Sequence, residues 1–103
     1  MDNNQENSTN PQNQTLIAFI PTIDYLIKNY AKSSSSDDQK AARVFLDFES
    51  REKLQRLRNE LVHVKNGQVN PSVLDQVIGL SRKSRYQSYE NWASIVLQLL
   101  VKK

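Results

Sequence analysis

The densest group of side chains capable of specific chemistry is a basic run late in the chain, formed by Arg82, Lys83 and Arg85. No acidic residue lies between Asp75 and Glu90, so this run has no local counter-charge. Serine, glutamine and tyrosine side chains surround it, a mixture that suits phosphate contact, with rings able to stack on bases. We predict contact with nucleic acid or another polyanion. The alternative is a helix end or turn whose charges only keep it solvated.

Three aromatic residues accompany the basic run at helical spacing. Tyr86, Tyr89 and Trp92 lie at i, i+3 and i+6, so they share roughly one face of a helix. The default interpretation is packing in a core. The alternative is contact with a protein partner, because Trp and Tyr are common anchors of protein interfaces.

A second row of basic residues lies in the middle of the chain. Arg51, Arg58 and Lys65 recur at i, i+7 and i+14, which suits either secondary contacts to a phosphate backbone or an ordinary solvated helix face. Neighbouring charges have a local use, because an acid four residues before a base stabilises a helix. These pairs are Asp47–Arg51, Glu49–Lys53 and Glu52–Arg56.

The segment Ile78-Gly79-Leu80-Ser81, followed by basic residues, resembles the turn of helix-turn-helix DNA-binding proteins. The resemblance covers about twenty residues and implies that the first helix ends at the glycine. It also implies that Ser81 caps a recognition helix whose basic residues, Arg82, Lys83 and Arg85, face phosphates or base edges. The chain departs from the pattern twice, with Asp75 in place of a small residue and Arg85 in place of a buried aliphatic one.

The composition leaves little material for catalysis or for a bound cofactor. The chain has no cysteine, two glycines and one histidine, His63, too few for a thiolate metal site or a glycine-rich phosphate loop. Asp24 and Asp75 are single acids on amphipathic segments, and no spacing suggests a nucleophile with its base. We predict a non-enzymatic protein with no metal, no cofactor and no small-molecule substrate.

Nothing in the sequence indicates a membrane or an export route. No apolar run approaches the roughly 20 residues of a membrane span, and residues 1–14 lack the basic and apolar regions of a signal peptide. The lack of cysteine fits a reducing compartment, so we expect a cytoplasmic protein. The net charge of +3 permits an acidic partner without requiring one.

The apolar spacing predicts an all-α fold, a small bundle of four or five helices formed by residues 15–103 as a single domain. Residues 1–14 are mostly Asn, Gln, Ser, Asp and Glu, and this composition predicts a disordered tail. The first helix should begin near Thr15, and Pro21 either kinks it or marks its true start.

The second helical segment, expected over residues 37–65, changes its apolar face part-way along. Either the helix breaks within residues 49–53, or one long helix buries different faces at its two ends, one of them against a partner. A capping box at residues 36–39 opens this segment, Asn66-Gly67 ends it, and Asn70-Pro71 opens the next helix.

Gly79 leaves the C-terminal part open to two interpretations. In one, a helix passes through Gly79 and ends near Ser84, and a fourth helix begins at Ser88. In the other, Gly79 ends a two-turn helix, Leu80 folds back on the preceding helix, and Ser81 caps a long last helix. The helical phase of the apolar residues from Tyr86 onward favours the second.

These patterns support two functional hypotheses of different classes. The first is a nucleic-acid-associated protein that contacts phosphates through Arg82, Lys83 and Arg85, acting alone, as a small subunit of a nucleoprotein assembly or as a divergent helix-turn-helix. The alternative is a protein-interaction or assembly module, a homo-oligomer or an adaptor, with no nucleic-acid role. The first requires the basic groups to converge on one surface, and the second requires an exposed apolar patch.

Overall fold

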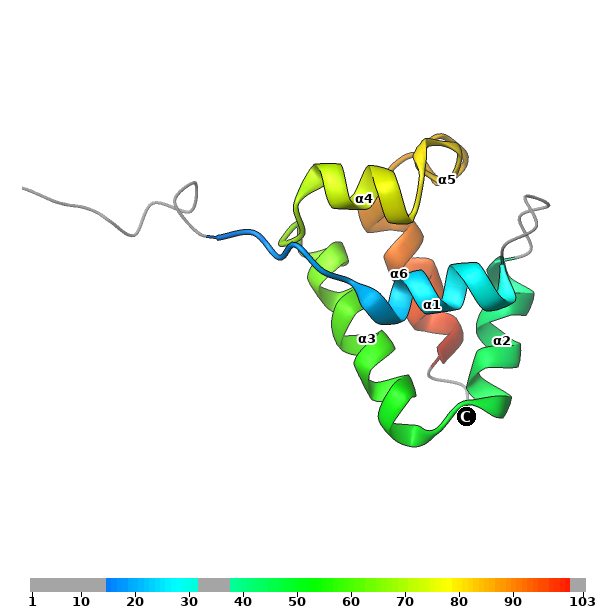
Figure 1. The fold of residues 1–103 in the computed structure, drawn as a ribbon. Helices are drawn as coiled ribbons and strands as arrows, with labels where there is room; N and C mark the ends of the chain where they lie inside the picture. Colours follow the sequence, from blue (N-terminus) through cyan, green and yellow to red (C-terminus); the bar gives the residue numbers. More distant parts are fainter. Residues whose placement is uncertain (1–14, 32–37, 101–103) are drawn as a thin grey trace, which may run out of the picture.

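The structure, a computed structural model, describes residues 15–31 and 38–100, and within these ranges the chain is all-α. It forms a compact globule of six helices (Figure 1). The helices are α1 (Pro21–Tyr30), α2 (Asp38–Phe48), α3 (Arg51–Lys65), α4 (Pro71–Val77), α5 (Leu80–Tyr86) and α6 (Tyr89–Leu100). The prediction of four or five helices is therefore wrong in number. The predicted tail over residues 1–14 lies outside the described residues.

The last helix, α6, is the centre of the core. It packs against α2, α3 and α5, while α1 crosses the front of the molecule in Figure 1 and packs against α2, α3 and α4. The inward face of α6 carries Trp92, Val96 and Leu100, each no more than 1% exposed. This spacing is the amphipathic helical pattern that the sequence displays in its last turns.

Pro21 marks the true start of the first helix, so a helix beginning near Thr15 is wrong. Proline lacks a backbone N–H and is favoured at the first helical position. The preceding segment instead pairs with the chain beyond α3, where the Ile17 N–H donates to the Gln68 carbonyl at 2.9 Å. Glu60 of α3 caps α1, and its carboxylate accepts from the backbone N–H groups of Thr22 and Ile23 at 3.1 and 2.8 Å.

The change of apolar face in the middle of the chain is a helix break. α2 ends at Phe48, and Ser50 caps α3 by accepting from the Lys53 N–H at 3.1 Å. The alternative of a helix break is thus correct, and each of the two helices directs its own apolar face to the same core. The core faces are Ala41, Ala42, Phe45 and Leu46 on α2 and Leu54, Leu57, Leu61 and Val64 on α3.

Gly79 separates α4 from α5, because its φ of +97° is not helical. Glycine adopts this φ without a Cβ clash. The prediction of a break at Gly79 is confirmed, but the long last helix is wrong, since Gln87 adopts a φ of +78° and ends α5. Ser81 does not cap α5, whose N-cap is Gly79, and Leu80 is 63% exposed rather than folded back. The start of the last helix next to Ser88 follows the other alternative.

The remaining turn signals between α3 and α4 are confirmed. α3 ends at Lys65, and Gly67 has a φ of +72°. The Asn70 side chain accepts from the Ser72 N–H at 2.9 Å, with Pro71 as the first residue of α4. The capping box predicted for residues 36–39 begins outside the described residues. Among the helices described, none is both long enough and apolar enough to cross a membrane.

Candidate functional site

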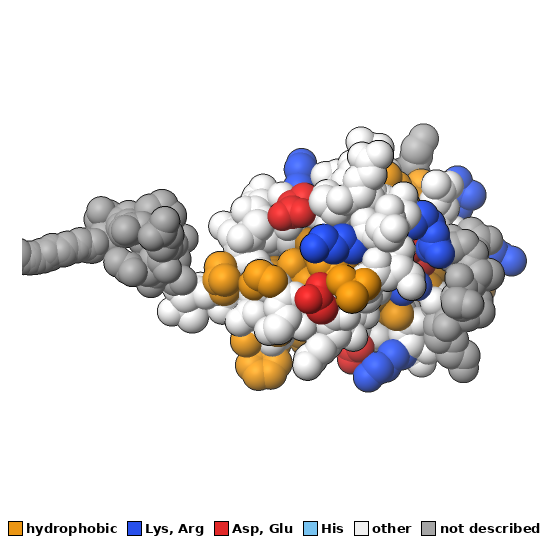
Figure 2. Space-filling model, turned by 90° about the horizontal axis from the view of Figure 1, so that it is seen from above, with side chains coloured by type: hydrophobic (Ala, Val, Ile, Leu, Met, Phe, Trp, Pro, Cys, Tyr) orange, Lys and Arg blue, Asp and Glu red, His pale blue; other side chains and the backbone are white. Residues whose placement is uncertain are grey.

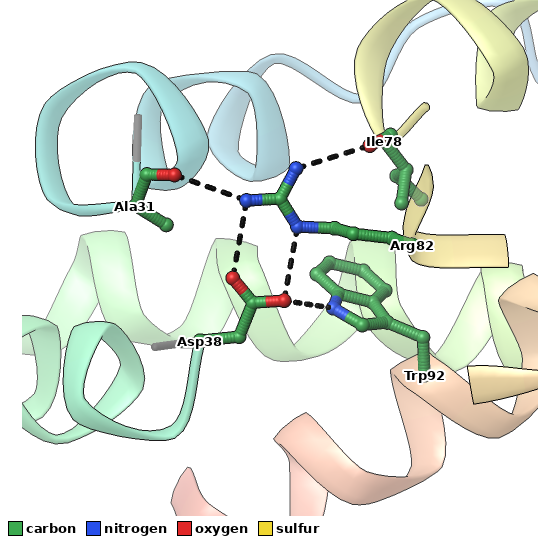
Figure 3. Close-up of polar contacts among 5 residues, drawn as sticks. All are labelled: Ala31, Asp38, Ile78, Arg82 and Trp92. Atoms are coloured by element: carbon green, nitrogen blue, oxygen red, sulfur yellow. Dashed lines mark hydrogen bonds and ion pairs between the residues drawn. The ribbon is translucent and has the colours of Figure 1, made fainter. Parts of the chain in front are cut away.

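Arg82, the first residue of the predicted basic cluster, points into the molecule (Figure 3). Its Nε and Nη2 donate to both carboxylate oxygens of Asp38 at 2.9 and 3.1 Å. Nη2 also donates to the Ala31 carbonyl at 3.0 Å, and Nη1 donates to the Ile78 carbonyl at 3.2 Å. The Trp92 Nε1 also donates to Asp38, at 3.1 Å. With side chains only 13% and 4% exposed, Arg82 and Asp38 form an internal ion pair.

This ion pair joins the ends of several helices. Asp38 is the first residue of α2, where the helix dipole favours a negative charge, and Arg82 lies against the carbonyl of Ala31 at the end of α1, where the dipole favours a positive one. α5 has no fully buried residue of its own. Arg82 is therefore a principal anchor of α5 to the rest of the molecule.

The other basic residues singled out from the sequence lie on two helices, Lys83 and Arg85 on α5 and Arg51, Arg58 and Lys65 on α3. Lys83 and Arg85 are exposed on α5, and the Lys83 Nζ lies 5.7 Å from the centre of the Tyr89 ring. Arg58 is half-buried, and its Nη2 donates to the Leu100 carbonyl at 2.6 Å. Its Nε is buried and has no hydrogen-bond partner among the described residues.

Arg51 and Lys65, the remaining members of the basic row, occupy the first and last positions of α3. The rise of a helix separates their backbones by about 21 Å. Of the basic run formed by Arg82, Lys83 and Arg85, only Arg82 makes internal contacts among the described residues. Lys83 and Arg85 are exposed.

Two of the three aromatic residues pack in the core, as the default interpretation of the sequence states. Tyr89 and Trp92 are 5% and 1% exposed, and Tyr86 is half-buried. The Tyr89 hydroxyl donates to Asp75 at 2.7 Å. Burial and this bond raise the pKa of Tyr89 above its ordinary value. Asp75, the departure from the helix-turn-helix pattern, thus serves an internal contact between α4 and α6.

The described residues hold a second polar cluster, between α1 and the break after α2. Glu49 accepts hydrogen bonds from the hydroxyls of Tyr25, at 2.7 Å, and Tyr30, and lies 3.6 Å from the Lys53 Nζ. The two hydroxyls hold the pKa of Glu49 below its usual value, and the bond to Glu49 raises the pKa of Tyr30. All four groups are engaged with one another, so the cluster has a structural explanation.

Candidate metal ligands do not gather in the described ranges, where no three His, Cys, Asp or Glu side chains form a metal-binding group. The single histidine, His63, is half-buried, and its Nδ1 lies 2.8 Å from the Gln68 Oε1.

Two clefts that the sequence did not reveal lie side by side along α1. The first, of about 300 Å³, is lined on one side by Ala18 to Pro21 and Asp24, and on the other by Val73, Gln76 and Val77 of α4. The second, of about 270 Å³, lies between Ile27 and Ala31 on one side and residues 78–82 and Arg85 on the other. We call these two clefts together the α1 groove.

Each cleft of the α1 groove has a large exposed apolar side chain at its wall. Phe19 is 80% exposed in the first cleft, and Leu80 is 63% exposed in the second. The helix expected from near Thr15 would have included Phe19, and one of the two interpretations of Gly79 folded Leu80 back on the preceding helix. The helix starts instead at Pro21, and α5 is held to the rest of the molecule by Arg82 rather than by Leu80.

The surface around α4 and α5 is mixed in character. Figure 2 views the molecule from this end, and hydrophobic side chains reach the surface between basic and acidic ones. Among the described side chains visible there, no unbroken basic patch covers the face. The arrangement suits apolar contact bordered by a few charges better than a continuous track for phosphates.

Comparison with known proteins identified no relative of this chain. A scan against models of protein families found no match, and searches of curated proteins and of solved structures found none either. The site must therefore be interpreted from its own residues.

Proposed function

We propose that this chain is a non-enzymatic protein-interaction module that binds apolar side chains of a protein partner in the α1 groove. The observation that carries the proposal is the exposure of Phe19 and Leu80, each at the wall of a cleft on the same side of α1. Large apolar side chains exposed beside a concave surface with a polar border are typical of protein interfaces. Burying one such side chain contributes roughly 1.5–3 kcal/mol.

The distribution of charge supports a protein partner over a polyanion. A phosphate-binding surface needs several cations directed to one side, so that counterions are released on binding. Arg82 is instead bound to Asp38, and Arg58 to the Leu100 carbonyl. With Arg51 and Lys65 at opposite ends of α3, the predicted contacts are spread over the molecule.

The proposal is tested by selecting peptides from an unbiased display library on the full chain. Selected peptides are then measured in solution against the parent and against variants Phe19→Ser and Leu80→Ser. We expect each substitution to weaken binding by about tenfold or more, the equivalent of roughly 1.4 kcal/mol. Phe48→Ser is the matched control, because Phe48 is 77% exposed and lines neither cleft. Peptides that are indifferent to Phe19 and Leu80 would refute the proposal.

A nucleic-acid role is the second candidate, and the observation that favours it is the exposure of Lys83 and Arg85 on α5. It requires that labelled DNA or RNA bind with an affinity that falls steeply with salt. The double variant Lys83→Ala, Arg85→Ala should then lose this binding, while Phe19→Ser should not. This pattern, in the absence of Phe19-dependent peptide binding, would replace the first proposal with the second.

A further inference from the structure

The short helix α5 lies at the upper edge of the molecule in Figure 1, between two joints with a positive φ. Gly79, before the helix, has a φ of +97°, and Gln87, after it, has a φ of +78°. Gln87 is the only non-glycine residue in the described ranges with a positive φ, a conformation that strains a residue with a Cβ. The backbone thus leaves the helical conformation at both ends of α5, which makes α5 a separate unit of seven residues.

The helices on the two sides of α5 are joined to each other directly. The hydroxyl of Tyr89, the first residue of α6, donates to Asp75 of α4 at 2.7 Å. Ile78, just before the first joint, is 2% exposed, and Tyr89, just after the second, is 5% exposed. The chain therefore leaves the core and returns to it between two fixed points, and moving α5 away leaves the bond between α4 and α6 in place.

Few side chains hold α5 to the rest of the molecule. None of its residues is fully buried, and its half-buried side chains are Arg82 and Tyr86. Tyr86 packs against the core, and its carbonyl accepts from the Asn91 Nδ2 at 2.8 Å. Arg82 supplies the ion pair with Asp38 and the bond to the Ala31 carbonyl. A segment that buries so little apolar surface opens at a lower free energy than the core of a domain.

We propose that residues 79–87 are a strap that opens as one unit about Gly79 and Gln87 while the other described helices stay folded. Opening breaks the ion pair between Arg82 and Asp38, so both charges meet water at the same time. It also relieves the positive φ of Gln87. The bonds of Arg82 oppose these gains and keep the strap closed.

The strap also decides whether the second cleft of the α1 groove exists. Residues 79–82 and Arg85 line that cleft, and all of them belong to the strap. A partner in the second cleft would therefore hold the strap closed, since it binds the closed state alone. This effect on a partner rests on the proposed function, whereas the opening itself does not.

Hydrogen exchange of the backbone amides of the full chain, followed residue by residue by NMR spectroscopy, tests the opening. The amides of residues 82–86 should share one degree of protection and exchange about 100-fold or more faster than the core amides of α3 and α6. Low concentrations of urea should leave exchange in α5 nearly unchanged, because the opening exposes little surface, and should accelerate exchange in α6. Equal protection in α5 and α6, no protection in α5, or protection that falls gradually towards its ends would overturn the proposal.

A matched pair of variants on the same helix tests the anchor. Arg82→Met should accelerate exchange in α5 by about tenfold or more, because the closed state loses bonds that the open state already lacks. Arg85→Met, the control, should change the rate by about twofold at most, since Arg85 is exposed. Equal effects of the two substitutions would refute Arg82 as the anchor of the strap. The exchange pattern of the parent decides the proposal even where Arg82→Met does not fold.

These outcomes are separate from those of the peptide selection. Rapid, uniform exchange in α5, together with selected peptides that ignore Phe19 and Leu80, would support the strap and refute the proposed function. Exchange in α5 as slow as in α6, together with peptides that depend on Phe19 and Leu80, would refute the strap and leave the proposed function intact.

Discussion

The substitution Arg82→Met removes the cation of the internal ion pair while keeping an unbranched side chain. Asp38, whose side chain is 4% exposed, would then lose both hydrogen bonds from the guanidinium group and keep the one from Trp92. Removing one member of a buried ion pair costs about 3–5 kcal/mol, because the other charge is left without a partner. The Ala31 carbonyl loses its donor as well. We expect a loss of about 3–4 kcal/mol, a large fraction of the 5–15 kcal/mol typical of a domain.

The measurement is urea unfolding followed by far-ultraviolet circular dichroism, because Trp92 contacts Asp38 and its fluorescence would report the substitution itself. A destabilisation of 3 kcal/mol lowers Tm by about 15 °C for a domain of this size. Asp38→Asn should cost less, about 2 kcal/mol, since the amide oxygen still accepts from Trp92. In the double variant, the loss of unfolding free energy should be about 2 kcal/mol smaller than the sum of the two single losses.

A small effect would refute this reasoning. If Arg82→Met costs less than about 1 kcal/mol, Arg82 behaves as a solvated surface cation. It would then be free to contact phosphates, as the sequence predicted. The result thus decides between the two roles of this residue, in addition to measuring the strength of the ion pair.

Three further predictions concern the helix ends and the titrating groups. Gly79→Ala should destabilise the chain by about 1 kcal/mol, because alanine rarely adopts a φ of +97°. The added Cβ would meet no neighbouring atom within 4 Å, so the whole cost should come from the backbone. Thermal unfolding measures this cost, and equal stability of variant and parent would contradict the prediction. Glu60→Gln should cost about 1 kcal/mol in denaturant unfolding, since a neutral amide caps α1 less well than a carboxylate does. Because Glu49 raises the pKa of Tyr30 in the folded state, stability should be full below about pH 10 and fall above it; Tyr30→Phe should flatten this decline in unfolding free energy, and an unchanged pH profile would exclude Tyr30 as its source.

Local signals in the sequence predicted the helix ends where the necessary partners are close along the chain. The predicted cap at Asn70 accepts a hydrogen bond from the residue two positions ahead, so its role follows from residue type and position. Ser50, inside the stretch where a break was one of two alternatives, accepts from the residue three positions ahead. The start of α1 was ambiguous for the opposite reason, because its capping carboxylate comes from Glu60, 38 residues from Thr22.

The same distinction, between partners close along the chain and partners far apart, explains how much of the candidate site the sequence predicted. The sequence identified the basic run on α5 but could not divide it, since nothing local distinguishes Arg82 from Lys83 and Arg85. The α1 groove left no periodic signal, because its walls come from α1, α4 and α5, which meet only when the chain folds.

By itself, the sequence determined that the chain is helical, where several of its helices begin and end, and which faces are apolar. These properties depend on backbone preferences and on hydrogen bonds within a few residues. Only the tertiary structure decided which charges are internal and which apolar residues stay exposed. Asp38 and Arg82 lie 44 residues apart, and their pairing depends on helix packing that no short-range pattern encodes. The same packing leaves Phe19 and Leu80 at the surface, beside the clefts on which the proposed function rests.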